Sequence, residues 1–131
     1  MTQRNILIVE DNDLQQALYG ALSRKFDLNM KMVKSCVDAL RAVSEGDNYD
    51  LILMDLGLAD TNGCDCARRI RDFEKTRGTH TPIVAVTGHT TDEYKNDCFE
   101  SGMDGFLCKP FSLDEFGAAI NKHARTPVSR D

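Results

Sequence analysis

Residues 6–13 read Ile-Leu-Ile-Val-Glu-Asp-Asn-Asp, a run of four apolar residues that ends abruptly in acidic and amide side chains. A continuous apolar run of this length is typical of a strand that is buried on both faces of a parallel sheet. The next segment, residues 14–22, carries apolar residues at the three- and four-residue spacing of an amphipathic helix. The chain is therefore expected to begin with a strand followed by a helix.

Four further apolar runs of strand length occur along the chain, at residues 30–33, 51–54, 83–86 and 105–108. Segments with helical spacing separate these runs, so strands and helices alternate throughout. Parallel strands need crossover connections, and such crossovers are right-handed. We therefore predict an α/β fold of the flavodoxin-like (βα)5 type, with a five-stranded parallel sheet in the order 2-1-3-4-5 and helices on both faces.

Several residues mark where the predicted helices begin and end. Thr90 with Glu93, and Ser112 with Glu115, each place a hydroxyl three residues before a glutamate, a spacing that favours a reciprocal cap at a helix start. Glycines that can close a helix in the left-handed conformation follow three helical segments, at Gly46, Gly78 and Gly102. We expect one domain over residues 1–125 and a loose tail over residues 126–131.

The composition excludes several classes of function. Hydrophobic residues make up 41% of the 131 residues and charged residues 28%, which is typical of a globular domain. The formal charge is −5 and the isoelectric point about 5.1, so the protein would repel nucleic acid phosphates and anionic lipids. No apolar run approaches the roughly 20 residues that span a bilayer, and no signal peptide is recognisable. We expect a cytoplasmic protein that neither binds nucleic acid directly nor inserts into membranes.

The five cysteines are expected to be reduced thiols. Their number is odd and they fall in predicted helices or strands, which argues against a disulfide framework. Cys64 and Cys66 are separated by one residue, but no second pair of ligands accompanies them, so a zinc site is not predicted. In the third predicted helix, a run of basic residues that includes Arg71 is expected to face solvent.

Charged and hydroxyl side chains follow four of the predicted strands. Strand ends are occupied by Glu10 and Asp11, Asp55, Thr87, and Lys109. In the predicted strand order these carboxyl ends meet at one edge of the sheet, where open α/β folds bind ligands. Three neighbouring carboxylates repel one another unless a cation lies among them, and oxygen ligands with room for water suit Mg²⁺. Asp55 could then act as a nucleophile toward a phosphoryl group, whose oxygens Lys109 and Thr87 would contact.

Four of these segments together resemble the receiver domain of two-component response regulators. They are residues 6–13, 50–63, 82–87 and 105–110, and the resemblance spans nearly the whole chain. It implies that Glu10 and Asp11 bind Mg²⁺, with Mn²⁺ as a substitute, and that Asp55 is both a metal ligand and the phosphoacceptor. The backbone carbonyl of Gly57 would be a further metal ligand.

The same resemblance implies a switch and a set of partners. Thr87 and Phe106 would move together, and Lys109 would contact the phosphoryl group. The phosphoryl donor would be a histidine kinase or a histidine phosphotransfer protein. The output would be a changed surface around the fourth predicted helix, the strand at 105–108 and the helix after it, read by a downstream protein or an attached kinase. A cis peptide bond between Lys109 and Pro110 is also implied.

The chain departs from the common pattern of this family at three positions. Ala59 occupies a position where proline is common, Gly57 offers no side chain beside the acceptor, and Phe106 replaces the more common tyrosine. The loop after Asp55 is therefore expected to be more mobile and more open to water. Any switching of Phe106 has to depend on packing, without a phenolic hydrogen bond. His89 is expected to border the site.

Other interpretations remain open from the sequence. Glu10 and Asp11 could simply cap the first helix. The domain could be a pseudo-receiver that acts only through protein contacts. A haloacid-dehalogenase-like phosphatase uses a similar aspartate nucleophile, but it needs a second aspartate two positions later, where this chain has Gly57. The chain could also be a single-domain regulator or one domain of a larger protein such as a hybrid sensor kinase.

Overall fold

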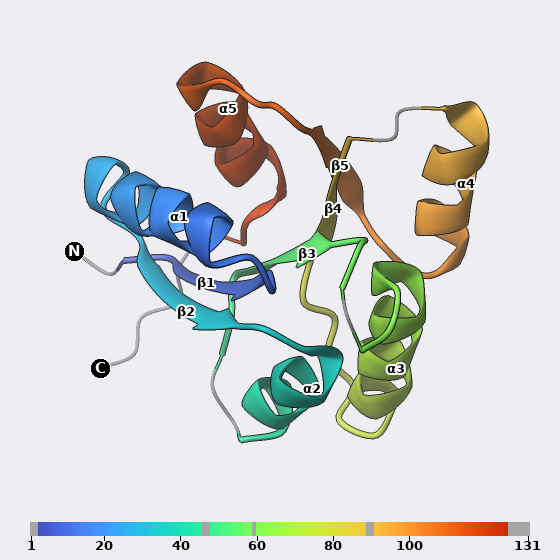
Figure 1. Ribbon diagram of the computed structural model, residues 1–131. Coiled ribbons are helices and arrows are strands. Elements are labelled where there is room, and N and C mark those ends of the chain that lie inside the picture. Colours follow the sequence, from blue (N-terminus) through green and yellow to red (C-terminus); the bar gives the residue numbers. More distant parts are fainter. Residues whose placement is uncertain (1–2, 46–47, 59, 89–90, 126–131) are drawn as a thin grey trace.

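The computed structural model describes residues 3–45, 48–58, 60–88 and 91–125. Its five strands are all parallel and lie in the order β2-β1-β3-β4-β5, which confirms the predicted fold class. Helices cover both faces of the sheet (Figure 1). The elements are β1 (Asn5–Val9), α1 (Asp13–Lys25), β2 (Asn29–Val33), α2 (Cys36–Ser44), β3 (Leu51–Asp55), α3 (Gly63–Lys75), β4 (Ile83–Thr87), α4 (Asp92–Glu100), β5 (Gly105–Cys108) and α5 (Leu113–His123).

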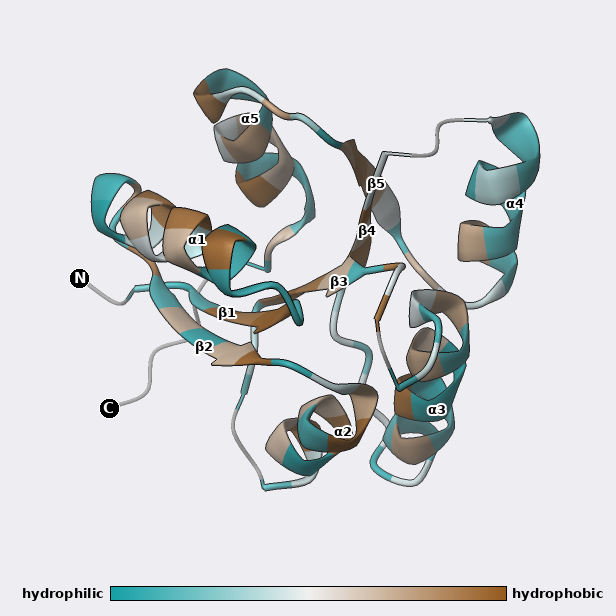
Figure 2. Cartoon of the chain, in the orientation of Figure 1, coloured by the Kyte–Doolittle hydropathy of each residue, from teal (hydrophilic) through white to brown (hydrophobic). Residues whose placement is uncertain are grey.

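The apolar runs are buried because the central strands have helices on both sides. Residues 6–9, 51–54 and 83–86 are at most 1% exposed. In Figure 2 brown follows β1, β3 and β4, while the helices carry both brown and teal segments. β2 lies at one edge of the sheet, and Met30 and Met32 are less exposed than Asn29 and Lys31, an alternation typical of an edge strand.

Two hydrophobic clusters lie on the two faces of the sheet. One is formed with residues of α1 and α5, including Tyr19, Leu22 and Phe116. The other is formed with residues of α2, α3 and α4, including Cys36, Ile70 and Cys98. The side chains of a strand alternate between these two clusters, so each strand is clamped from both faces. The strand ends that carry polar residues are thereby held in fixed relative positions.

The helix caps agree with the sequence in part. Ser112 and Glu115 form the predicted reciprocal cap of α5, and Gly78 and Gly102 have positive φ angles of 66° and 98°. The prediction that Thr90 caps α4 was wrong, because the hydroxyl of Thr91 accepts the hydrogen bond from the amide of Tyr94. Two adjacent threonines offer the same chemistry, so spacing alone could not choose between them. Thr90, Gly46, Ala59, His89 and the tail at 126–131 lie outside the described residues.

The basic face of α3 is not entirely a solvated surface, which corrects the expectation for Arg71. Its side chain is only 13% exposed and forms ion pairs with Glu74 and Asp104. It also donates to the carbonyl oxygens of Gly102 and Thr81 at 2.9 and 2.8 Å. Arg71 therefore ties α3 to the segments that lead into β4 and β5.

The expectation that all cysteines are reduced was also wrong. Cys36, the first residue of α2, and Cys66, in the first turn of α3, form a disulfide with a Cα–Cα distance of 5.6 Å. Cys64, Cys98 and Cys108 are free thiols. An odd count excludes only a complete pairing, and it says nothing about one pair brought together by packing. The peptide bond between Lys109 and Pro110 is cis, as the family resemblance implied. Not one helix among the described residues combines the length and apolar character needed to cross a membrane.

Candidate functional site

Three carboxylates meet at the carboxyl ends of β1 and β3. Glu10 and Asp11 directly follow β1, and Asp55 is the last residue of β3. Because Val9 pairs with Met54 across the two strands, the residues that follow are neighbours. One carboxylate oxygen from each of the three residues lies within 4.8 Å of the others. The predicted acidic cluster is therefore present.

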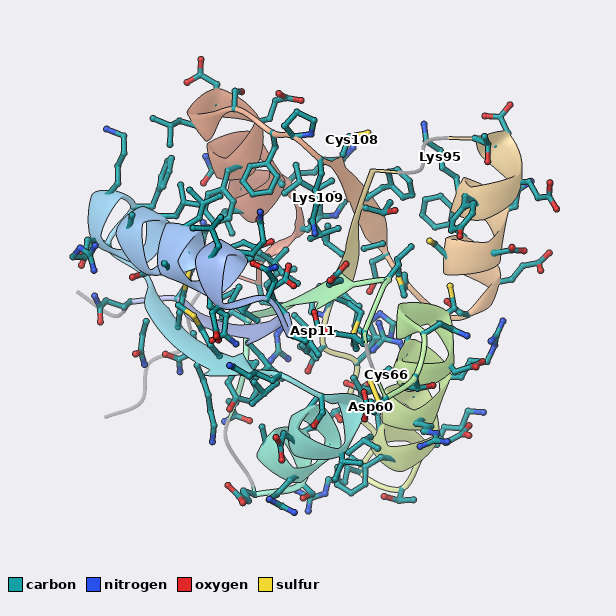
Figure 3. The ribbon with its side chains drawn as sticks, viewed as in Figure 1. Asp11, Asp60, Cys66, Lys95, Cys108 and Lys109 are labelled. Carbon is teal, nitrogen blue, oxygen red and sulfur yellow. A yellow bond between two sulfur atoms is a disulfide. The ribbon has the colours of Figure 1, made fainter. Side chains whose placement is uncertain are left out.

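Lys109 provides the positive charge at this cluster. Its Nζ lies 3.4 Å from Oε1 of Glu10 and 3.6 Å from Oδ1 of Asp55. Figure 3 shows Lys109 and Asp11 at the same end of the sheet. The side chain of Lys109 is 27% exposed, so its interaction with the carboxylates is only partly screened by water. One ammonium cannot neutralise three carboxylates, and the site keeps a strong attraction for a further cation.

Burial makes Glu10 an unusual carboxylate. Its side chain is only 2% exposed, and Oε2 accepts a hydrogen bond from the amide of Asn12 at 3.2 Å. Desolvation raises the pKa of Glu10 above its ordinary value, and the charge of Asp55 raises it further. The Asn12 amide and the Lys109 ammonium oppose this shift. A divalent cation would favour the ionised form of Glu10 in the same way that Lys109 does.

The side chain of Asp55 is more accessible to solvent than that of Glu10. Its side chain is 14% exposed, compared with 2% for Glu10. Oδ1 accepts a hydrogen bond from the amide of Gly57 at 3.2 Å, which fixes the carboxylate at the start of the loop that leads to α3. The Gly57 backbone is thus next to the cluster, and a carboxylate fixed by an amide and an ammonium is oriented for nucleophilic chemistry.

Thr87 lies near the acidic cluster at the end of β4, and Phe106 lies on the neighbouring strand β5. Asp55 pairs with Val86, so Thr87 follows immediately at the end of β4, where it is 4% exposed. The amide of Lys109 donates to the carbonyl oxygen of Thr87 at 2.8 Å. Phe106 is half-buried and packs against the cluster of hydrophobic residues that faces α4. The structure therefore gathers the polar residues and leaves Phe106 outside the acidic cluster.

The structure adds residues that sequence reasoning missed. Lys95 on α4 places its Nζ 5.3 Å from the centre of the Phe106 ring, a cation–π geometry. The carboxylate of Asp60 accepts hydrogen bonds from the amides of Cys36 and Val37 and so holds the loop after β3 against the start of α2. Neither contact follows a recognisable spacing, because each joins elements that are distant in the sequence.

The donor set fits Mg²⁺ better than a transition metal. Its side chains offer only carboxylate oxygens, which are hard ligands, and a partly exposed site leaves room for water. Among the described residues, no cysteine thiol belongs to the cluster. Cys64 and Cys98 lie on the α3 and α4 side of the sheet, and Cys108 is the last residue of β5. The cluster therefore has the chemistry to hold a divalent cation through oxygen ligands.

Comparison with known proteins agrees with this arrangement. The profile of the family described as the response regulator receiver domain matches residues 6–121. Hybrid signal transduction histidine kinase I of Dictyostelium discoideum is 34% identical over 125 residues, which is 92% of this chain and 7% of that protein.

Two solved structures are also similar. The receiver domain of a sensor histidine kinase from Pseudomonas aeruginosa, solved with a magnesium ion coordinated in its active-site cleft, is 31% identical, with a TM-score of 0.81 over 92% of this chain and 97% of that one. The other is from a co-crystal of the Saccharomyces cerevisiae histidine phosphotransfer signaling protein and the receiver domain of its downstream response regulator. The matching chain of that co-crystal is 34% identical, with a TM-score of 0.84 over 93% of this chain and 89% of that one.

The curated relatives are much longer than this chain, which spans between 4% and 21% of their lengths. They include histidine kinases, a transcription factor and an osmolarity two-component protein. What they share with this chain is one domain of about its size. With the family profile covering most of its residues, the chain belongs to the response regulator receiver domain family.

Proposed function

We propose that this domain is a phosphoacceptor in a two-component phosphorelay and that Asp55 receives the phosphoryl group in a Mg²⁺-dependent reaction. The observation that supports this most directly is the position of the Asp55 carboxylate, which lies within 4.8 Å of two further carboxylates and 3.6 Å from the Lys109 ammonium. A nucleophile between a cation site and a fixed ammonium is suited to an incoming anionic phosphoryl group.

The transfer is a displacement at the phosphorus atom. A carboxylate oxygen of Asp55 forms a bond to phosphorus, and the phosphorus–nitrogen bond of a phosphohistidine breaks. The electron pair of that bond stays on the histidine ring, which takes up a proton from solvent. The product is an aspartyl phosphate, whose oxygens Lys109 would contact through its ammonium and Thr87 through its hydroxyl.

Glu10, Asp11, Asp55 and the carbonyl of Gly57 would hold the metal ion. When bound, Mg²⁺ supplies positive charge that offsets repulsion between the carboxylates and the phosphoryl oxygens. Mn²⁺, which is also bound by oxygen ligands, would replace it. Hydrolysis of the phosphoryl group by the domain itself is part of this proposal, since a Cβ at Gly57 would come as close as 4.0 Å to Oδ1 of Asp55 and glycine leaves that approach open to water.

The response to phosphorylation would pass from Thr87 to Phe106. Thr87 is buried beside Asp55, and Phe106 is half-buried beneath Lys95 on the α4 side of the sheet. A shift of Thr87 toward the phosphoryl group would open space at the neighbouring strand, which Phe106 could enter. The surface formed by α4, β5 and α5 would then present a different shape to a downstream protein or to a covalently attached kinase.

The phosphoryl donor would be a histidine kinase or a histidine phosphotransfer protein that docks beside α1. Leu14 is 77% exposed and Leu18 is 44% exposed, one helical turn apart. An open groove of about 350 Å³ next to them is lined by Gln15, Leu18, Lys109, Pro110 and Phe111. An apolar stripe that adjoins the Lys109 side of the site fits an apolar helix face of the donor. The co-crystallised yeast relative supports a phosphotransfer protein as one such donor.

Residues 1–125 would be the receiver unit and residues 126–131 a tail. The domain would work in the cytoplasm, without direct contact to nucleic acid, because its net charge of −5 repels phosphate backbones.

The test is the intact mass of the protein after incubation with acetyl phosphate and Mg²⁺. One added phosphoryl group is expected, and it should be absent from Asp55→Asn and after addition of a chelator. If no adduct forms, binding of beryllofluoride to Asp55 is measured next, because rapid hydrolysis would hide an adduct but not this stable mimic. Failure of both experiments would overturn the phosphoacceptor proposal in favour of a pseudo-receiver.

A further inference from the structure

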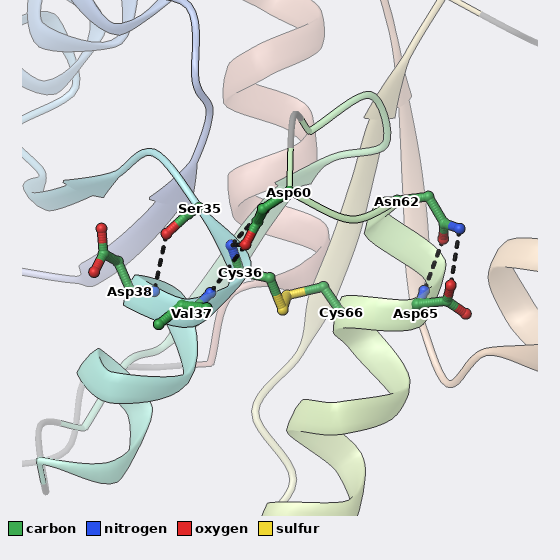
Figure 4. The surroundings of a disulfide bond; sticks show 8 residues. All are labelled: Ser35, Cys36, Val37, Asp38, Asp60, Asn62, Asp65 and Cys66. Atoms are coloured by element: carbon green, nitrogen blue, oxygen red, sulfur yellow. Dashed lines mark hydrogen bonds between the residues drawn. A yellow bond between two sulfur atoms is a disulfide. The ribbon is translucent and has the colours of Figure 1, made fainter.

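The disulfide between Cys36 and Cys66 joins two helices beside the acidic cluster. Cys36 begins α2 and Cys66 lies in the first turn of α3 (Figure 4). Both residues are fully buried. The crosslink closes a loop with a sequence separation of 30 residues, which contains α2, all of β3 and the phosphoacceptor position Asp55. It therefore constrains the segment that carries the proposed chemistry.

The loop between β3 and α3 is attached to the same point. Oδ1 and Oδ2 of Asp60 each lie 3.1 Å from the amide nitrogen of Cys36, and Oδ2 lies 3.4 Å from that of Val37. Figure 4 shows the Asp60 carboxylate directed at the start of α2, where the disulfide also begins. The first turn of α2 thus binds the loop through hydrogen bonds to the Asp60 carboxylate, and it is linked to α3 by the disulfide.

A short path leads from Cys66 to Asp55. The amide of Cys66 donates to the carbonyl oxygen of Asn62, the N-cap of α3, and the amide of Gly63 donates to the carbonyl oxygen of Leu56 at 3.1 Å. A Cβ built on Gly63 would lie 2.7 Å from the carbonyl oxygen of Asp55. The start of α3 is therefore in direct contact with the backbone of the phosphoacceptor, and no side chain separates them.

We propose that Cys36 and Cys66 form a thiol–disulfide modification site that exchanges with cellular dithiols and disulfides, and that its oxidised state holds the loop after Asp55 in the arrangement that binds Mg²⁺. This inference rests on the proposed function of the acidic cluster. The loop supplies the Gly57 backbone next to Asp55. Reduction removes the covalent link between α3, at the end of this loop, and the first turn of α2, which binds Asp60 of the loop. The reduced domain then has to order the loop when the metal binds, which lowers the affinity.

The exchange needs only a dithiol of the thioredoxin or glutaredoxin class, or glutathione disulfide in the oxidising direction. A thiolate of the reductant attacks one sulfur, the S–S bond breaks, and a mixed disulfide and one cysteine thiolate form. The second thiol of the reductant attacks the mixed disulfide and leaves as the oxidised reductant, and Cys36 and Cys66 each end with one proton. Since both sulfurs are buried, exchange requires local opening of the first turn of α2 or α3.

Two features favour a responsive site over an inert crosslink. In a cytoplasmic protein, the compartment proposed above, disulfides are usually transient, catalytic or redox-sensing. Burial also raises the pKa of the Cys98 thiol to about 12, with Cys64 adding to the shift, so Cys98 remains a protonated and unreactive thiol. Internal reshuffling by attack of Cys98 on the disulfide is thereby suppressed.

The test compares oxidised and reduced protein directly. The full chain is equilibrated with glutathione disulfide or with a dithiol, desalted, and checked by alkylation and peptide mapping. Calorimetric titration with MgCl₂ is expected to give at least about fivefold tighter binding in the oxidised form, a typical size for coupling between two sites. Cys36→Ala and Cys66→Ala should each bind Mg²⁺ equally in both conditions, whereas Cys108→Ser, which removes a thiol outside the pair, should keep the difference.

A second measurement separates this inference from the proposed function. Amide hydrogen exchange at Gly57, Leu58 and Asp60 is followed in the two redox states without metal. Faster exchange in the reduced form is expected, and it would support the restraint of the loop by the disulfide. If neither form bound Mg²⁺, the proposed function would be contradicted, but the restraint of the loop would still stand. Equal exchange in both states, equal Mg²⁺ affinities, or failure of peptide mapping to find the Cys36–Cys66 crosslink after oxidation would each overturn the inference.

Discussion

The Nζ of Lys109 lies 3.6 Å from Oδ1 of Asp55, although the two residues come from β-strand ends that are separated by β4 in the sheet. Lys109 bridges that gap because it extends across the end of β4, where its own amide is bonded to the carbonyl oxygen of Thr87. The same ammonium also reaches Glu10 at 3.4 Å. The Lys109 side chain thus connects β5 with the ends of β1 and β3. A change at Asp55 can therefore reach β5 through this ammonium.

Replacement of Lys109 should separate phosphoryl uptake from the structural response. In Lys109→Ala the acidic cluster keeps its three carboxylates, so Asp55 should still take up a phosphoryl group in the presence of Mg²⁺. Phosphorylation should then no longer change hydrogen exchange in β5 and α5, because the connecting ammonium is absent. Lys109→Arg, which keeps a charge, serves as the matched control. A normal change in exchange in Lys109→Ala would contradict this role.

Removal of one carboxylate should stabilise the metal-free protein. Asp11→Asn relieves repulsion with Glu10 and Asp55, and the expected gain in the free energy of unfolding without Mg²⁺ is about 1 kcal/mol. The wild type should gain stability on addition of Mg²⁺ and lose it with a chelator, whereas Asp11→Asn should respond much less. Urea denaturation with and without MgCl₂ measures both effects.

The control for this experiment is an acidic residue far from the cluster. Asp72 is exposed on α3 and pairs with Lys75 at 3.6 Å. Asp72→Asn should change the free energy of unfolding by less than about 0.5 kcal/mol and should leave the response to Mg²⁺ intact. A Mg²⁺ response that survives in Asp11→Asn, or that disappears in Asp72→Asn, would argue against the acidic cluster as the metal site.

The sequence was sufficient to predict the sheet and the cluster because both follow from one regularity. Four of the strands, β1, β3, β4 and β5, end in or lead directly into a polar residue, and parallel strands place these ends at one edge of the sheet. The positions of Glu10, Asp55 and Lys109 relative to one another therefore followed from strand order alone. The further roles of Gly57, Thr87 and Phe106 remain predictions, because they concern bound or moving states.

The sequence could not predict contacts that depend on how the helices and loops pack against one another. Cys36 and Cys66 meet because α2 and α3 pack side by side, and neither the number of cysteines nor their helical location contains that information. Asp60 is similar, since its carboxylate caps a helix that precedes it in the chain. The charged run predicts a solvated Arg71, but two of its partners, Gly102 and Asp104, come from a segment far along the chain.

The contact between Lys95 and Phe106 should restrain the aromatic ring. The ammonium lies 5.3 Å from the ring centre, and such a pair at a partly exposed site contributes about 0.5 to 1 kcal/mol. Lys95→Ala should lower the free energy of unfolding by this amount, and Lys95→Arg should retain most of it. A double-mutant cycle with Phe106→Leu isolates the pair, because the coupling disappears once either partner is absent. Additive effects of the two single substitutions would exclude a direct interaction.

His123 should make the stability of the domain depend on pH. Its ring lies over Gly105, where an added Cβ would collide with the imidazole. Burial lowers the pKa of His123 below its ordinary value of 6.5, the charge of Lys122 lowers it further, and Asp104 opposes the shift. Between the lowered pKa of His123 in the folded protein and its ordinary pKa in the unfolded chain, the unfolded state therefore binds a proton more readily than the folded state. The free energy of unfolding should accordingly rise with pH through this window and should fall when the pH drops below about 6.5.

His123→Gln removes the titrating group but keeps a polar side chain of similar reach. Urea denaturation at pH 5.5, 6.5 and 7.5 should show a smaller decrease on acidification for this variant than for the wild type. The difference between the two proteins is the informative quantity, because the carboxylates of the acidic cluster contribute equally to both curves and cancel. If the two pH profiles are parallel, His123 does not carry a lowered pKa in the folded protein, and its ring is hydrated rather than packed on β5.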